Sequence, residues 1–206
     1  MIVDNILASG SPRRKELLQE AGVKFTVFAV EGDESLTDEE RANPATAAET
    51  LAERKAAAAI QAILAQAYLG QATVIAADTM VVLDGEIFGK PHGYDGARSM
   101  LQRLSGRTHQ VITGVSVWRL LATGPDKVTM GKRNFHEVSQ VTFRDLTDKE
   151  IKEYIATGEC RDKAGAYGIQ GKGAALVDHY EGSYSNIVGL PVEKLLQLFP
   201  DLVEDQ

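Results

Sequence analysis

The stretch Ile2-Val3-Asp4-Asn5-Ile6-Leu7-Ala8-Ser9-Gly10-Ser11-Pro12-Arg13-Arg14 joins a short apolar run to a set of small residues and a helix start. Residues 2–8 predict a buried strand. Ser11 as N-cap and Pro12 at the first helical position predict a helix, which ends at Gly22. Because strands and helices keep alternating after this unit, the chain is predicted to have an α/β fold.

The remaining elements follow from hydrophobic patterns and turn signals. Strands are predicted over residues 25–30, 73–77 and 109–122, with a hairpin over 80–88 that turns at Asp84-Gly85. Helices are predicted over 44–68 and 94–104, from the capping box at Thr147 to Gly158, and from Pro191 to the residue before Pro200. Residues 31–41 and 124–132 are predicted to be loops, the second one exposed between two strands.

Composition excludes several classes of protein. The chain has 206 residues, of which 44% are hydrophobic, so one domain or two closely packed lobes is expected and overall disorder is excluded. A net charge of −7 disfavours binding to nucleic acid or to an anionic membrane. No apolar run reaches the ~18 residues of a membrane span, and residues 1–8 lack the basic start of a signal peptide. With Cys160 as its one cysteine, the protein is expected to be cytoplasmic.

The turn at residues 9–14 is a candidate anion site. A helix N-terminus attracts anions through its dipole and its unpaired N–H groups. Arg13 and Arg14 lie in the first turn, where the dipole disfavours cations, so they indicate a bound anion. The alternative is an exposed turn with ordinary surface arginines.

Asp78 interrupts the apolar run of residues 74–82. A lone carboxylate there is costly unless it lies at a strand end or holds a metal ion, and sites collect at the strand ends of α/β sheets. Asp78 is therefore a candidate site residue, which lies at the end of a strand or holds a metal ion. The alternative is a strand-terminating residue in a turn.

Other polar residues give weaker signals. Lys90, in Gly89-Lys90-Pro91, could reach a phosphate, although a surface lysine is the default interpretation for Lys90 and for Lys55. Residues 162–171 are rich in glycine and alanine, which lets a backbone approach a ligand, and Gln170 offers a donor–acceptor pair suited to the edge of a base. Plain turn glycines are the alternative.

Several reaction classes are set aside. The four histidines show no metal-ligand spacing, no Gly-x-Ser-x-Gly motif is present, and a P-loop would require glycine where Ala166 stands. The available carboxylates, lysines and arginines suit a metal-assisted reaction at phosphate.

Five motifs together resemble the Maf family of nucleoside triphosphate pyrophosphatases: residues 7–14, 77–79, 89–91, 104–106 and 162–171. Their order and spacing agree over residues 7 to about 192. The resemblance implies one domain of two lobes over residues 1–206, with a mixed central sheet flanked by helices around a substrate cleft (Maf/ITPase-like). It also implies a divalent cation, Mg²⁺ or Mn²⁺, and a homodimer that binds a nucleoside triphosphate.

The resemblance also implies roles for single residues. Asp78 matches the catalytic acid/base position, and Glu34 with Asp78 matches the metal side of the cleft, although Glu34 lacks the family's usual Asp-Glu context. The positions that line the cleft are matched by Ser9, Arg13, Arg14, Lys55, Lys90 and Lys163.

The family divides by three pocket residues. Arg13, Thr79 and Gln170 match the branch that acts on dTTP and UTP, whereas the branch that acts on 7-methyl-GTP carries Trp, Gln and Glu. The resemblance also leaves a second class open, a regulator of cell division that binds nucleotides without hydrolysing them. Residues 124–133 depart from the compact members of the family.

Overall fold

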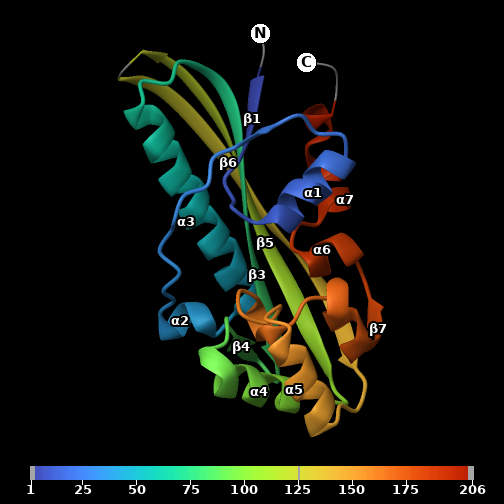
Figure 1. Ribbon diagram of the computed structural model, residues 1–206. Helices are drawn as coiled ribbons and strands as arrows, with labels where there is room; N and C mark the ends of the chain where they lie inside the picture. The colour runs from blue at the N-terminus through green and yellow to red at the C-terminus, as the bar shows by residue number, and fades with distance from the viewer. Residues whose placement is uncertain (1–2, 125, 204–206) are drawn as a thin grey trace.

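The computed structural model describes residues 3–124 and 126–203 and contains a mixed seven-stranded sheet with helices on both faces (Figure 1). The strands run in the order β2-β1-β3-β5-β6-β7, and β4 pairs with the far end of β3. β1 is parallel to β2 and β3, while all other pairs are antiparallel. The predicted α/β class and mixed central sheet are confirmed.

The element bounds are as follows. The strands are β1 (Val3–Leu7), β2 (Thr26–Val27), β3 (Gly70–Leu83), β4 (Glu86–Phe88), β5 (Thr108–Gly124), β6 (Lys127–Phe143) and β7 (Val177–Glu181). The α-helices are α1 (Pro12–Glu20), α2 (Asp38–Arg41), α3 (Pro44–Ala65), α4 (Gly93–Leu104), α5 (Asp148–Ala156), α6 (Tyr184–Val188) and α7 (Val192–Leu198). Short 3-10 helices are η1 (Ala164–Ala166), η2 (Gly171–Leu176) and η3 (Pro200–Leu202).

The two faces of the central strand β3 bury different neighbours. Val74 and Ala76 pack with Ala56 and Ile60 of α3 on one face. The alternate residues Ile75 and Ala77 pack in a separate cluster with side chains of α1 and α7. This alternation follows from the two-residue period of a strand, so each face receives its own layer of helices.

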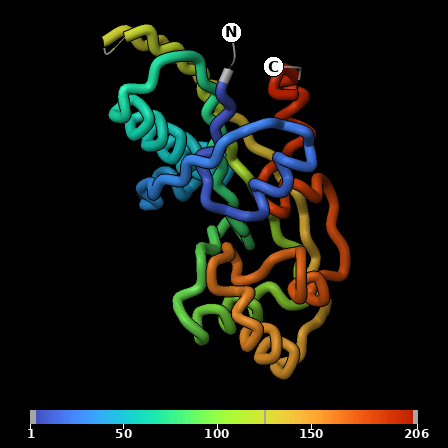
Figure 2. The backbone as a smooth tube through the Cα atoms, turned by 45° about the horizontal axis from the view of Figure 1, so that its top comes forward, coloured from blue at the N-terminus to red at the C-terminus, as the bar shows by residue number. Residues whose placement is uncertain are grey.

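β3, β5 and β6 extend beyond these layers into a second lobe. There a third cluster joins Val81 and Leu83 of β3 to apolar side chains of α4 and α5. Figure 2 shows α4, α5 and the glycine-rich segment grouped at one end of the long strands, apart from α1, α3 and α7. The two lobes therefore share one continuous sheet. Among the described residues, no helix combines the length and apolarity needed to cross a bilayer.

All five predicted helices are confirmed, since α1, α3, α4, α5 and α7 start within a residue or two of their predicted N-termini. Two capping boxes occur. The predicted one joins Thr147 to Glu150, and a second joins Thr37 to Glu40 and starts α2 inside the segment predicted to be a loop. α6 and β7 are absent from the prediction because each has only 5 residues, too few to display a period.

The predicted extent of the loop over residues 124–132 is wrong, although the described residues there are largely exposed and lie between two strands as predicted. β5 continues to Gly124 and β6 begins at Lys127, while Pro125 lies outside the described residues. The start of β6 is exposed at nearly every position. The tip of a hairpin that buries neither face shows no alternation of apolar and polar residues, so its polar composition resembles that of a loop.

Gly114 of β5 sets the distance between α3 and the sheet. A Cβ atom at Gly114 would overlap the backbone of Ala48 and Glu49 in α3. The helix backbone therefore lies directly on the strand, at the residue that pairs with Asp78 of β3.

Replacing Gly114 with alanine should destabilise the fold, since the whole backbone of α3 would have to move. Overpacking of this kind costs about 2–3 kcal/mol, and we expect a matching loss in the free energy of unfolding in urea. Gly131→Ala is the matched control, because Gly131 lies in β6 and a Cβ atom there would meet no other atom within 4 Å. Equal stabilities of the two variants would contradict the close-packing argument.

Candidate functional site

A cavity of about 1250 Å³ opens beside β3, between the two lobes. Its lining includes every residue that the sequence singled out for function: Ser9, Arg13, Arg14, Glu34, Lys55, Asp78, Thr79, Lys90, Lys163 and Gln170. These residues come from loops and elements spread over most of the chain, so the fold brings all of them together.

The cavity exists because β3 is uncovered along one edge. β1 pairs with β3 only as far as Ile75, whose carbonyl accepts from the N–H of Ala8. On the same edge, β4 begins to pair only at Val81. Asp78 and Thr79 lie in this gap, and successive side chains of a strand point to opposite faces. The cleft therefore receives groups from both faces of the sheet.

The predicted position of Asp78 at a strand end is wrong. Asp78 lies inside β3, which runs without interruption from Gly70 to Leu83. The strand that ends here is the neighbouring β1. The cleft therefore does open at the end of a strand, but that strand is β1 and not β3, which carries Asp78.

Lys55 of α3 bridges the two carboxylates of the cleft. Its Nζ lies 2.5 Å from Oδ1 of Asp78 and 3.0 Å from Oε1 of Glu34. The side chains of Lys55 and Asp78 are only 15% and 13% exposed. The hydrogen bond from Lys55 holds the pKa of Glu34 below its usual value, although partial burial opposes this shift.

Glu34 and Asp78 suit a divalent cation that arrives with its substrate. Within residues 3–124 and 126–203, no cluster of three or more His, Cys, Asp or Glu side chains could hold a metal ion alone. Mg²⁺ commonly takes one or two carboxylates and completes its shell with phosphate oxygens and water. Two carboxylates around one ammonium group fit that requirement.

The guanidinium group of Arg14 makes three hydrogen bonds within the protein. Its Nε donates to the Gly189 carbonyl at 2.7 Å, its Nη2 to Oγ1 of Thr79 at 3.0 Å, and its Nη1 to Oγ of Ser9 at 3.4 Å. Burial lowers the pKa of Arg14, while the charge of Asp78 opposes this. Arg14 thus fixes the turn before α1 as well as contributing charge.

Ser9 is held as a hydrogen-bond donor. Its Oγ accepts from the N–H of Ser11 at 3.2 Å and from Arg14, which uses both of its lone pairs. Its proton remains for a ligand beside the N-terminus of α1. The predicted N-cap position of Ser11 is confirmed, but the Ser11 side chain makes no capping bond.

The other predicted residues differ in how they are held. Lys163 donates to the carbonyl of Glu159 and to Asp162, and Lys90 lies 3.4 Å from Glu34. No hydrogen bond or ion pair among the described residues engages the side chains of Arg13 or Gln170. These two side chains keep their polar groups for a ligand.

The glycine-rich segment is held on the sheet by close packing. A Cβ atom at Gly165, whose φ is +67°, would press on the side chain of Val81. Next to it, the hydroxyl of Tyr167 lies 2.7 Å from Nε2 of His109, and burial lowers the pKa of His109 to about 4. A neutral His109 therefore anchors this wall of the cleft.

The residues that support Arg14 and Thr79 from behind are absent from the sequence-based predictions. Thr113 of β5 lies 2.9 Å from Thr79, and Asn186 of α6 binds Thr113 through both backbone and side chain. Gly189 ends α6 and binds Arg14. The one available signal was an asparagine directly before the apolar pair Ile187-Val188.

The chain is similar to known proteins in sequence and in fold. The family described as "Maf-like protein" matches residues 4–202. The chain is 48% identical to a dTTP/UTP pyrophosphatase of Moorella thermoacetica over 94% of both chains. It is 46% identical to that of Symbiobacterium thermophilum, over 94% of this chain and 91% of the other. The Staphylococcus aureus Ham1 protein has a similar fold, with a TM-score of 0.50 and 14% identity over 96% of this chain and 98% of the other.

Replacing Lys55 with methionine should raise the pKa of Glu34, because the hydrogen bond and charge of Lys55 are the main causes of its depression. NMR titration of the carboxyl groups in metal-free protein measures this. A carboxyl group whose pKa is depressed in the folded protein stabilises the fold above its unfolded pKa, and this stabilisation is lost as the pH falls through the folded pKa. In Lys55→Met, the contribution of Glu34 to the pH dependence of stability in acid should therefore shrink. In the control Lys90→Met, which removes the longer 3.4 Å contact, the pKa should rise less; equal rises would contradict the assignment.

Proposed function

The chain belongs to the Maf family, and from this premise we propose that its cleft hydrolyses dTTP and UTP to the nucleoside monophosphate and pyrophosphate. The observation that carries the proposal is that all the predicted site residues line one cavity. The relatives from Moorella thermoacetica and Symbiobacterium thermophilum are named for this activity, which favours it over 7-methyl-GTP hydrolysis and over a binding-only regulator.

The charges of the cleft suit a triphosphate. Arg13, Arg14, Lys55, Lys90 and Lys163 all line it. Such groups stabilise the charge that develops on the phosphates in the transition state. The N-terminus of α1 and the free proton of Ser9 add donors for phosphate oxygens on the same side.

Asp78 is the proposed general base. It takes a proton from the water that attacks the α-phosphorus, the bond from that phosphorus to the bridging oxygen breaks, and pyrophosphate leaves. Lys55 is paired with Asp78 before the substrate binds, and its ammonium group can then turn towards a phosphate oxygen. Glu34 and Asp78 would hold the divalent cation, which lowers the pKa of bound water and neutralises phosphate charge.

The base is proposed to bind near Arg13, Thr79 and Gln170. Arg13 supplies donors for a carbonyl or phosphate oxygen, and Gln170 can both donate and accept. A site built on such hydrogen bonds rejects a purine through its bulk and through the polar groups that it would leave unpaired.

We further propose that the protein acts in the cytoplasm as a homodimer of two-lobed single domains. The rings of Tyr180 and Tyr184 lie 5.7 Å apart at β7, the outermost strand on its side of the sheet. These two side chains and that of Val138 in the adjacent β6 are exposed and supply apolar surface for a second copy. A molar mass of one 22.3 kDa chain in light scattering would contradict the dimer.

Incubation with UTP and Mg²⁺ should release UMP and pyrophosphate, and Asp78→Asn should lower kcat about 100-fold or more, the scale of a lost general base. Asp95→Asn, at an exposed position of α4, is the control and should keep full activity. Release of UDP and orthophosphate would refute the reaction, and near-normal turnover by Asp78→Asn would move the base to another residue.

A series of kcat/KM values should rank dTTP and UTP first, CTP next, and ATP and GTP last. Unpaired buried polar groups cost about 1–3 kcal/mol each, so the preference for UTP over GTP should be about 100-fold. Gln170→Glu should weaken UTP use, because it replaces a donor with an acceptor. Equal values for UTP and GTP would refute the pyrimidine preference.

A further inference from the structure

The hydroxyl group of Thr79 stands at the end of a chain of hydrogen bonds that crosses the sheet. Nη2 of Arg14 donates to Oγ1 of Thr79 at 3.0 Å. Oγ1 of Thr79 lies 2.9 Å from Oγ1 of Thr113. Oγ1 of Thr113 in turn lies 2.9 Å from the carbonyl oxygen of Asn186.

The chemistry of these groups determines which partner donates in each of these three hydrogen bonds. A hydroxyl group has one proton and two lone pairs. The carbonyl of Asn186 can only accept, so the proton of Thr113 points to it. The contact between the two threonines must then use the proton of Thr79. Since Thr79 also accepts from Arg14, one lone pair is all that it has left for a ligand.

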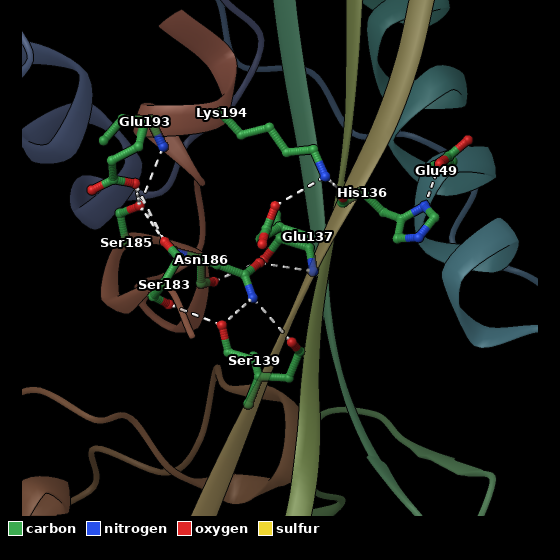
Figure 3. Close-up of polar contacts among 12 residues, drawn as sticks. Glu49, His136, Glu137, Ser139, Ser183, Ser185, Asn186, Glu193 and Lys194 are labelled. Atoms are coloured by element: carbon green, nitrogen blue, oxygen red, sulfur yellow. Dashed lines mark hydrogen bonds and ion pairs between the residues drawn. The ribbon is translucent and has the colours of Figure 1, made fainter. Parts of the chain in front are cut away.

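Asn186 gives the chain a rigid end. Its side chain is fully buried and accepts from the N–H of Thr113 while donating to the carbonyl of Val111 and to Oγ of Ser139. Figure 3 shows the amide of Asn186 held against Ser139 on the long strand, with Ser183 and Ser185 beside it. The carbonyl that receives the proton of Thr113 therefore belongs to a residue fixed on both β5 and β6.

We propose that Thr113 and Asn186 are positioning residues for base selection, because they make Thr79 an obligatory acceptor towards the nucleotide. This inference rests on the proposed function. N3 of uracil or thymine carries a proton that this lone pair can accept. N3 of cytosine carries a lone pair, which would face that of Thr79.

Gln170 cannot make this distinction alone. No contact among the described residues fixes its exposed amide, so it can turn either its oxygen or its nitrogen towards the base. Arg13 only donates, and both pyrimidines have a carbonyl to receive it. Thr79 is therefore the residue whose fixed polarity can distinguish uracil from cytosine at N3.

Thr113→Val tests the proposal, since valine has nearly the same shape and removes the acceptor for the proton of Thr79. Thr79 can then donate to N3 of cytosine. The ratio of kcat/KM for UTP to that for CTP should fall about tenfold, mainly because CTP improves, in keeping with the penalty for an unmatched polar group. The dissociation constants of the non-hydrolysable α,β-imido analogues of UTP and CTP should show the same change.

Two matched variants separate this role from a structural one. Thr113→Ser keeps the hydroxyl group and should restore the wild-type ratio. Ser139→Ala breaks the Ser139 contact of Asn186 but leaves the chain to Thr79 intact, so it should lower thermal stability and leave the ratio unchanged. A wild-type ratio in folded Thr113→Val, or a changed ratio in Ser139→Ala, would overturn the proposal.

Two further arms identify the substrate proton and separate this proposal from the activity itself. If Thr79 accepts from a sugar hydroxyl group, Thr113→Val will change kcat/KM for UTP and for CTP by the same factor and will leave kcat/KM for 3′-deoxy-UTP unchanged. That result would overturn the assignment to the base. If the wild-type protein hydrolyses neither UTP nor dTTP, the proposed function fails. The binding ratio of the imido analogues would still support or refute the role of Thr113.

Discussion

The contact between α3 and Gly114 is the packing constraint on which the site depends. Gly114 pairs with Asp78 across the sheet, and its missing side chain lets the backbone of Ala48 rest on β5. Lys55 follows about two helical turns later, which brings its ammonium group to Asp78 and Glu34. Because interiors are close-packed, a larger residue at position 114 would displace the helix and the cation that it carries.

The uncovered edge of β3 has an equally direct consequence. Asp78 belongs to the face covered by α3, and Thr79 belongs to the face of α1 and α6. Across a fully paired strand these neighbours could not meet one ligand. The gap between the end of β1 and the start of β4 lets side chains from both faces of the sheet line one cleft.

The predictions from sequence succeeded where local rules suffice. Caps, glycine stops and apolar periods located five of the α-helices, and Asp84-Gly85 forms the predicted turn with positive φ at both residues. They failed where pairing between segments far apart in the sequence determines the local structure. β3 continues through Asp78 because β5 pairs with it from Gly70 to Val82. The start of β6, from Lys127, pairs with β5 although it has no buried face. The polar residues in these stretches are typical of a turn or a loop when only the local sequence is considered.

The sequence by itself determined which chemical groups are present, since the motifs, the two arginines at a helix start and the lone carboxylate in an apolar run all pointed to one phosphate-binding site. Only the tertiary structure decided what each group is free to do. Arg13 and Arg14 are adjacent and chemically identical. Arg14 is bound to Gly189 and Thr79, whereas the Arg13 side chain makes no hydrogen bond or ion pair within residues 3–124 and 126–203. Likewise, the proton of Thr79 is directed by a carbonyl more than 100 residues away in the chain. A hydrogen bond depends on the position of both partners, and the distant partner is placed by packing, which no local pattern records.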